Sequence, residues 1–122
     1  MSDKPVPERL QVKHGRRLAV IGASAALEAV VGATDERADP NEAEVAVLFV
    51  ADRAGFDAHF PALLKRLRPD VILWLAYPKL TSPLARDLSR DIIHNLARTI
   101  GLDTVSQIAI DQDWSALRLK RL

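Results

Sequence analysis

Apolar positions along the chain form short continuous runs separated by segments with helical spacing. Two runs, residues 45–50 and 71–77, are apolar throughout rather than alternating, and a first strand over roughly residues 17–22 carries the apolar run 18–21. Strands that are apolar on both faces are typical of the middle of a parallel sheet with helices on both sides. The pattern therefore predicts three parallel strands at the centre of the fold.

Two helices are predicted between these strands. Ser24 can cap a helix over residues 25–31, and Gly32 can end it because glycine accepts a positive φ. A second helix carries apolar residues at helical spacing from Phe56 to Leu67, and Pro61 is placed in its first turn, where proline is tolerated.

The third helix is expected to be the best defined. Ser82 is a capping residue, Pro83 suits the first helical position, and Gly101 ends the segment. An apolar stripe runs along it through Leu84, Leu88, Ile92, Leu96 and Ile100. The free backbone N–H groups at such a helix start are suited to binding an anion.

The last two elements differ from the rest. Residues 105–110 predict a shorter strand, and after a polar turn residues 117–120 alternate between apolar and basic. Such alternation indicates an antiparallel partner strand with one exposed face or edge. The order βαβαβαββ predicts an α/β fold: a three-layer, Rossmann-like sandwich with a mostly parallel sheet of about five strands ending in an antiparallel hairpin.

The length of 122 residues is that of one domain, residues 1–122. Residues 1–9 contain two prolines and are expected to form a loose N-terminal leader. Residues 33–43 are acidic with little apolar content, which predicts an exposed loop.

Composition excludes several classes of function. The chain has no cysteine, which excludes disulfides and thiolate chemistry and favours a cytoplasmic location. No apolar run approaches the roughly 18 residues of a membrane span. The net charge of +1 gives no field that would attract nucleic acid. The three histidines are scattered, and no metal site is expected.

Two segments resemble the class I methyltransferases. Residues 10–26 are similar to the lead-in to that family's first motif, and residues 68–74 to the turn that enters its fifth strand. The resemblance implies a trimmed methyltransferase-like fold whose last two strands form the same kind of hairpin.

The departures from that family concern its cofactor loop. A member would have an acidic residue near Val20 and glycines near Ser24 and Ala26, and its second strand would end in an acid that holds the ribose. The acidic loop stands in place of that strand, and added Cβ atoms keep the backbone away from a nucleoside. We therefore expect no cofactor.

A second resemblance covers nearly the whole chain. Residues 73–79, residues 87–91, and residues 109–111 with 114–118 are similar to a short bacterial family known only as a domain of unknown function. This resemblance supports the fold and the choice of residues, and it implies no activity.

Candidate site residues lie where parallel strands end, because ligands in open α/β sheets bind beyond the carboxyl ends of the strands. Lys79 and Ser82, assisted by Arg86 or Arg90, are predicted to bind an anionic group. The alternative is that Ser82 only caps its helix and that Lys79 is solvated. The full set of predicted ligand-binding residues is Ser24, Tyr77, Lys79, Ser82, Arg86, Arg90, Asp111, Trp114 and Ser115.

Other residues have structural interpretations. Asp87 and Arg90 are expected to pair on the helix surface, or Asp87 or Asp91 can reach Arg118 and form a polar cluster that pins the helix to the hairpin. Trp114 is either a hydrophobic plug or a stacking platform at the mouth of a pocket, whereas Trp74 is expected in the core.

The leading functional hypothesis is a non-catalytic binding module that has lost its cofactor loop. Its partner would be another protein or a small anionic ligand, with no role for nucleic acid or membrane. The alternative is a small enzyme that acts on an anionic small molecule at the strand ends, with an acid from Asp111 or Asp87 and Lys79 as electrostatic stabiliser. The sequence leaves open whether the chain forms a homo-oligomer.

Overall fold

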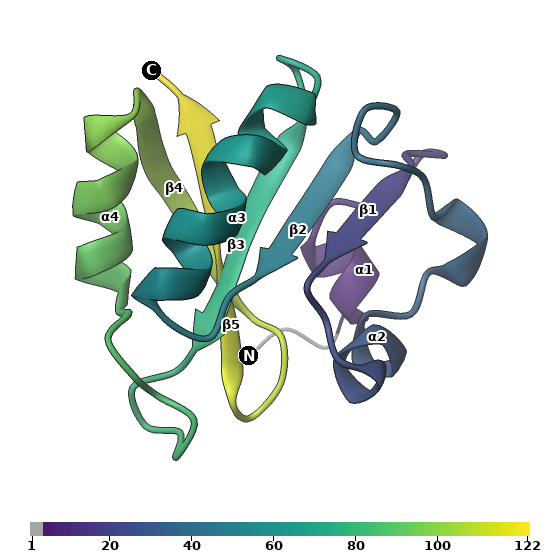
Figure 1. Cartoon of the computed structure of the whole chain (residues 1–122). Helices are drawn as coiled ribbons and strands as arrows, with labels where there is room; N and C mark the ends of the chain where they lie inside the picture. Colours follow the sequence, from purple (N-terminus) through teal and green to yellow (C-terminus); the bar gives the residue numbers. More distant parts are fainter. Residues whose placement is uncertain (1–3) are drawn as a thin grey trace.

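The computed structural model describes residues 4–122 and places five strands in one mixed sheet (Figure 1). The strand order is β1-β2-β3-β5-β4, with β1 to β3 parallel and the last two strands antiparallel. The predicted α/β sheet with a terminal hairpin is confirmed. The strands are β1 (Leu18–Ile21), β2 (Val45–Phe49), β3 (Ile72–Pro78), β4 (Leu102–Ala109) and β5 (Trp114–Arg121).

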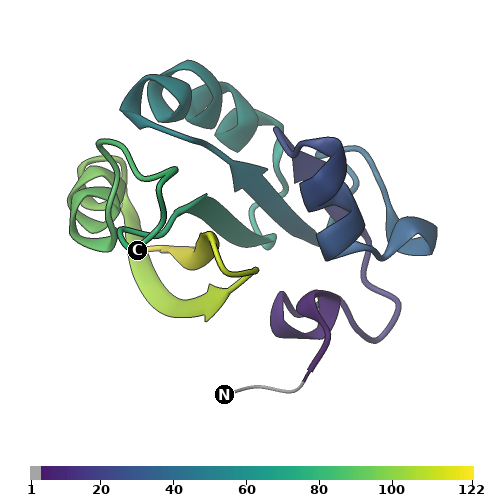
Figure 2. The same cartoon turned by 90° about the horizontal axis from the view of Figure 1, so that it is seen from below.

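Helices cover both faces of the sheet, so the fold has the predicted three layers (Figure 2). The helices α1 (Val6–Arg9) and α2 (Ala25–Val31) pack on one face, and α3 (Arg53–Arg66) and α4 (Arg90–Thr99) on the other. Strand β2 contributes to both cores because its side chains alternate, and all five of its residues are buried. This is why its sequence is apolar throughout.

The N-terminal segment is part of the core, in contrast to the loose leader expected for residues 1–9. Residues 1–3 lie outside the described part of the chain, but α1 begins at Val6, which is buried, and Leu10 is fully buried. The indole N–H of Trp74 donates a hydrogen bond to the carbonyl of Leu10 at 2.9 Å. Trp74 is a core residue, as expected.

Helix α2 forms as its local sequence predicts. The Ser24 hydroxyl accepts a hydrogen bond from the Leu27 N–H at 3.2 Å, and Gly32 follows the helix with φ +65°. The acidic segment 33–43 contains a short 3₁₀ helix, η1 (Thr34–Glu36), and a single parallel bridge between Leu18 and Arg37. Strand β1 therefore forms one edge of the sheet.

Helix α3 begins earlier than expected. Asp52 caps it by accepting a hydrogen bond from the Gly55 N–H at 2.8 Å, so the helix starts at Arg53. Pro61 consequently lies inside the helix and not in its first turn. The apolar spacing marks this helix only from Phe56 onward, whereas the cap, Asp52, lies four residues before it.

Helix α4 begins later than expected, and the prediction that it starts at Ser82 was wrong. Ser89 is its cap, with the hydroxyl accepting from the Ile92 N–H at 3.2 Å, and the residues between Lys79 and Ser89 form an irregular loop. The helix packs through Ile93 and Ala97. In the predicted stripe, Leu88 is buried and Leu96 partly buried, whereas Leu84, Ile92 and Ile100 are exposed.

Strand β5 lies inside the sheet between β3 and β4, and β4 is the second edge. The alternation of apolar and basic residues over 117–120 therefore does not mark an edge strand. None of the helices that the structure describes is long and apolar enough to cross a membrane.

Candidate functional site

The carboxyl ends of β1, β2 and β3 meet at the lower edge of the sheet in Figure 1, where the β4–β5 turn and the loop after β3 extend beyond them. Two adjoining hollows lie at this edge, with volumes of about 450 Å³ and about 390 Å³. They share Ala51, Leu84 and Trp114 as walls. We call the pair the strand-end groove.

The loop after β1 forms one side of the larger hollow. Gly22 has φ +80°, and a Cβ built on it would lie 2.6 Å from the carbonyl oxygen of Phe49 on the neighbouring strand. The glycine is therefore required for packing of this loop on β2. Ser24, a predicted ligand-binding residue, lines the larger hollow, with its hydroxyl engaged as the cap of α2.

The opposite side of the larger hollow is the β4–β5 turn. One carboxylate oxygen of Asp111 accepts hydrogen bonds from the N–H groups of Asp113 and Trp114 at 2.8 and 2.9 Å. Asp113 accepts from the Ser82 hydroxyl at 2.9 Å, and its carbonyl accepts from the Lys79 N–H at 2.8 Å. These bonds tie the turn to the loop after β3 and place two carboxylates at the groove.

Trp114 separates the two hollows and is half-buried. Its ring meets the Phe49 ring edge-on, with centroids 5.4 Å apart and an interplanar angle of 66°. The ring is thus partly packed and partly available to a ligand, and a stacking role for it stays a prediction.

Tyr77 and Ser115 do not join this groove. They are directly paired across β3 and β5, so their side chains share a sheet face. Tyr77 belongs to the core beneath α3 and α4, where its hydroxyl accepts a hydrogen bond from Gln107 Nε2 at 3.2 Å. Trp114 packs on the other core. The sequence alone does not predict which sheet face each of these side chains occupies, because that depends on the register in which the strands pair.

The Tyr77 phenol provides a pH-dependent test of this placement. Burial raises its pKa above 10.0, with a partial lowering by Arg90 and a small further rise from Asp91. Because the pKa of the phenol is higher in the folded state than in the unfolded state, its contribution to the free energy of unfolding is fully present below pH 10. This contribution is lost as the pH rises above that value.

As the pH rises above about 10, we expect the free energy of unfolding to fall more steeply in the native chain than in Tyr77→Phe. Urea titrations of both proteins measure this difference. Tyr77 is the only tyrosine, so phenolate absorbance follows it alone. Equal pH slopes in the two proteins would contradict the burial of the phenol.

The predicted anion site at a helix start is not formed, because no helix begins at Ser82. Ser82 is buried, and its hydroxyl accepts from the Leu84 N–H at 3.0 Å. Of the three cations of the predicted anion site, Lys79, Arg86 and Arg90, only Arg86 lines the groove, in its smaller hollow. Lys79 and Arg90 line neither hollow.

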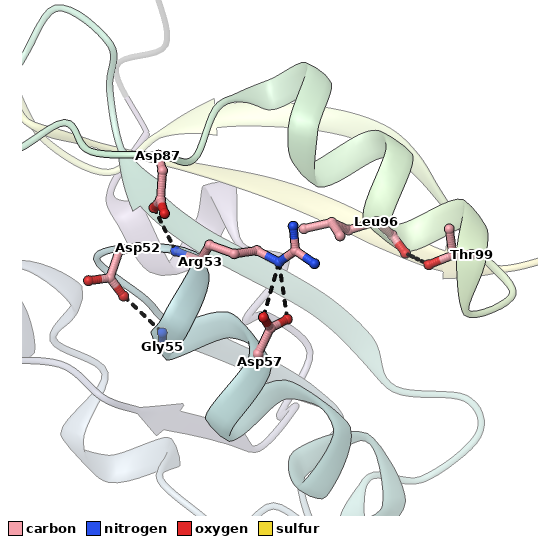
Figure 3. A network of polar contacts seen from close by, with 7 residues as sticks. All are labelled: Asp52, Arg53, Gly55, Asp57, Asp87, Leu96 and Thr99. Carbon is pink, nitrogen blue, oxygen red and sulfur yellow. Dashed lines mark hydrogen bonds and ion pairs between the residues drawn. The ribbon is translucent and has the colours of Figure 1, made fainter.

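Asp87 has a structural role that differs from both predicted ones. It lies before α4, and its carboxylate accepts a hydrogen bond from the Arg53 N–H at 2.8 Å, at the start of α3 (Figure 3). Within residues 4–122 no hydrogen bond or ion pair connects Arg118 to Asp87 or to Asp91, or Arg90 to Asp87. The predicted polar cluster of Asp87, Asp91 and Arg118 was therefore wrong, as was the helix-surface pair with Arg90.

Replacing Asp87 with alanine is expected to destabilise the chain by about 0.5–2 kcal/mol, because the first N–H of α3 loses its acceptor. Asp87→Asn keeps an acceptor oxygen of the same reach and is expected to lose less. Chemical denaturation of the three proteins measures the difference. If both variants were as stable as the native chain, the contact to Arg53 would contribute nothing.

Several groove residues were missed as ligand-binding candidates, and their signals in the sequence are weak. Leu84 was assigned to a helix stripe, yet it forms a wall of both hollows. Val30 and Phe49 belong to a helix and a strand, and only the fold brings them to this edge. Asp113 follows Asp111 by two residues, a spacing that suits the Asx turn in which the Asp111 carboxylate accepts from the Asp113 N–H.

Comparison with solved structures identifies the architecture. The chain aligns along its whole length with 67% of the Bacillus subtilis m1A22 tRNA methyltransferase TrmK, at 9% identity and a TM-score of 0.59. A putative type 11 methyltransferase from Sulfolobus solfataricus aligns over 94% of this chain and 88% of its own, at 15% identity and a TM-score of 0.56. The chain has a methyltransferase-like fold.

Further solved structures are similar to this chain in the same way. DhpI, solved as a complex with SAH, aligns over 96% of this chain and 82% of its own, at 11% identity and a TM-score of 0.56. The chain spans about half the length of the mitomycin 7-O-methyltransferase MmcR. No protein-family model and no curated protein matches the sequence. The resemblance to a short bacterial family therefore stays a prediction.

The residues at the groove do not fit an adenosyl cofactor in the way that the family resemblance requires. Strand β1 is an edge of the sheet, and the described residues between α2 and β2 form η1 and a bridge where the ribose-holding strand would lie. Gly22 packs against protein backbone, and the position of the next expected glycine is the capping Ser24. Among residues 4–122 no three His, Asp or Glu side chains are grouped to hold a metal ion.

Proposed function

We propose that the chain is a non-catalytic binding module whose strand-end groove takes a segment of a partner protein. The composition of the groove carries this proposal. Leu84 and Val30 expose 47% and 38% of their surface at its walls, and Trp114 stands between the hollows. Exposed apolar side chains around an aromatic ring, with an arginine nearby, are typical of the centre of a protein interface.

The charge of the groove indicates the chemistry of the partner. Asp111 and Asp113 line the larger hollow, and among the described residues around it there is no lysine, arginine or histidine. Complementary charge favours a partner segment with an apolar side chain next to a lysine or arginine. The same carboxylates oppose the small anionic ligand that the sequence also suggested.

The alternative of a small enzyme has less support. Of the groups it requires, Asp111 lines the groove, but Asp87 is bonded to the start of α3 and Lys79 lines neither hollow. The acid and the stabilising cation are thus not gathered around one position. A cytoplasmic location likewise remains a prediction from the sequence.

Selection of a random peptide library against the chain tests the proposal. We expect enriched peptides to carry an aromatic or aliphatic residue beside lysine or arginine, and Leu84→Asp to weaken their binding at least tenfold. Leu80→Asp is the matched control, because Leu80 is exposed on the same loop and lines neither hollow. Enrichment of acidic peptides, or equal binding to both variants, would overturn the proposal.

Calorimetric titration with S-adenosylmethionine and its demethylated product tests the non-catalytic part. We expect no binding, since Gly22 packs against the backbone of Phe49 and the Ser24 hydroxyl is engaged as the cap of α2. Saturable binding of either compound, accompanied by signal shifts at residues 22–24 in NMR spectra, would show that the cofactor function is retained.

A further inference from the structure

A separate hollow lies at the other end of the strands from the strand-end groove. It has a volume of about 200 Å³ and lies where the chain enters β3 and leaves β5. Pairing of β3 with β5 begins at Leu73 and Leu119, but β5 continues to Arg121 alongside β4. Beyond Leu119 the two strands therefore diverge, as the upper part of Figure 1 shows. We call this opening the β3–β5 fork.

The inner wall of the fork is apolar. Leu73, Leu102 and Leu119 are almost fully buried and line it, and Leu64 of α3 closes one side. The hollow is somewhat larger than the cavity of about 150 Å³ that holds a benzene ring in another protein. It is therefore large enough for one ring or a short alkyl chain.

The mouth of the fork is basic. Arg118, Lys120 and Arg121 line it, and none of the three makes a hydrogen bond or ion pair through its side chain within residues 4–122. Asp70 is the one acid that lines the hollow, and it is bonded to Arg68 at 3.1 Å. The fork thus combines an apolar interior with unpaired positive charge.

Strand alternation explains how cations from both sheet faces reach one hollow. Leu119 packs in the core beneath α3 and α4, so Arg121, two residues on, points to the same face. Arg118 pairs with Trp74 and belongs to the opposite face, together with Lys120. Because the strands have separated here, both faces border the opening.

Helix electrostatics do not account for these cations. A negative helix C-terminus explains basic residues such as Lys65 and Arg66 in the last turn of α3. The three cations of the fork lie on a strand, where no comparable dipole exists, and β5 is not an edge that they would protect from pairing.

We propose that the β3–β5 fork binds a small organic anion whose apolar body enters the hollow and whose carboxylate or phosphate contacts Arg118, Lys120 and Arg121. This site is independent of the strand-end groove and of the function proposed for it. Aryl and short acyl anions match the size and charge of the fork.

Benzoate is the probe of choice, with NMR spectra of the full ¹⁵N-labelled chain as the readout at low ionic strength. We expect saturable shifts in residues 71–73, 102 and 119–121. Benzylamine and acetate are matched probes, one with the opposite charge and one without the ring, and each is expected to bind at least tenfold more weakly. Phenyl phosphate against benzoate distinguishes a phosphate from a carboxylate source.

Substitutions test whether the cations of the fork bind the anion. Arg118→Gln combined with Arg121→Gln is expected to weaken benzoate binding at least fivefold, whereas Lys13→Gln, which removes an exposed cation that does not line the fork, should not. Equal binding of benzoate and benzylamine by the native chain, shifts spread over the whole surface, or unchanged binding in the double variant would each overturn the proposal.

Discussion

Replacing Gly22 with alanine is expected to lower the free energy of unfolding by about 2–5 kcal/mol. Two costs add: a left-handed backbone at a residue with a Cβ costs about 1–2 kcal/mol, and overpacking costs about 1–3 kcal/mol. The overpacking arises because the new Cβ would lie 2.6 Å from the Phe49 carbonyl oxygen. Backbone of a buried strand cannot move away as the end of a flexible side chain can.

The chain contains a matched control for this substitution. Gly101 has φ +79°, nearly that of Gly22, but a Cβ added there has no atom within 4 Å. Gly101→Ala is therefore expected to show the backbone cost of about 1–2 kcal/mol alone. Urea denaturation of both variants separates the two costs. Equal losses would mean that the loop after β1 can move away from β2, leaving room for a ligand beside it.

Replacing Trp74 with alanine is expected to cost about 3–5 kcal/mol, the range for truncation of a buried tryptophan. The side chain is 2% exposed and fills the core between the sheet and the α1–α2 layer. Its indole N–H also donates a hydrogen bond to the carbonyl of Leu10. The substitution therefore affects both the packing of the sheet and the attachment of the N-terminal segment.

Trp74→Phe separates these two contributions. Phenylalanine retains much of the apolar volume but leaves the Leu10 carbonyl without its donor, at an expected cost of about 1–3 kcal/mol. Trp114→Ala is the control for loss of a half-buried indole and is expected to cost less than Trp74→Ala. Far-ultraviolet circular dichroism in urea compares the variants. A Trp74→Ala protein as stable as Trp114→Ala would contradict the central position of Trp74.

Local features of the sequence were sufficient to predict an element where the capping or terminating residue lies within a few residues of the group that it contacts. Ser24 and the Leu27 N–H are three positions apart, and Gly32 directly follows the last helical residue, so both ends of α2 could be predicted. The apolar runs of β2 and β3 likewise predict buried strands, because residues on both of their faces avoid water wherever the neighbours lie.

The start of α4 shows where local reasoning fails. Ser82 with Pro83 and Ser89 are both plausible caps, and the sequence offers no reason to reject the first. In the folded chain the Ser82 hydroxyl reaches Asp113, which is 31 positions away, and Asp87 reaches the start of α3. These long-range bonds hold the intervening residues in a loop, and that loop forms a wall of the strand-end groove.

The sequence by itself determined the α/β class, the order of the strands along the chain, and the edge of the sheet at which polar residues collect. Tertiary structure alone decided which of these residues meet. Tyr77 and Ser115 turn to one face and Trp114 to the other because strand register fixes the alternation of side chains. The β3–β5 fork also depends on register, since it opens only where two paired strands part.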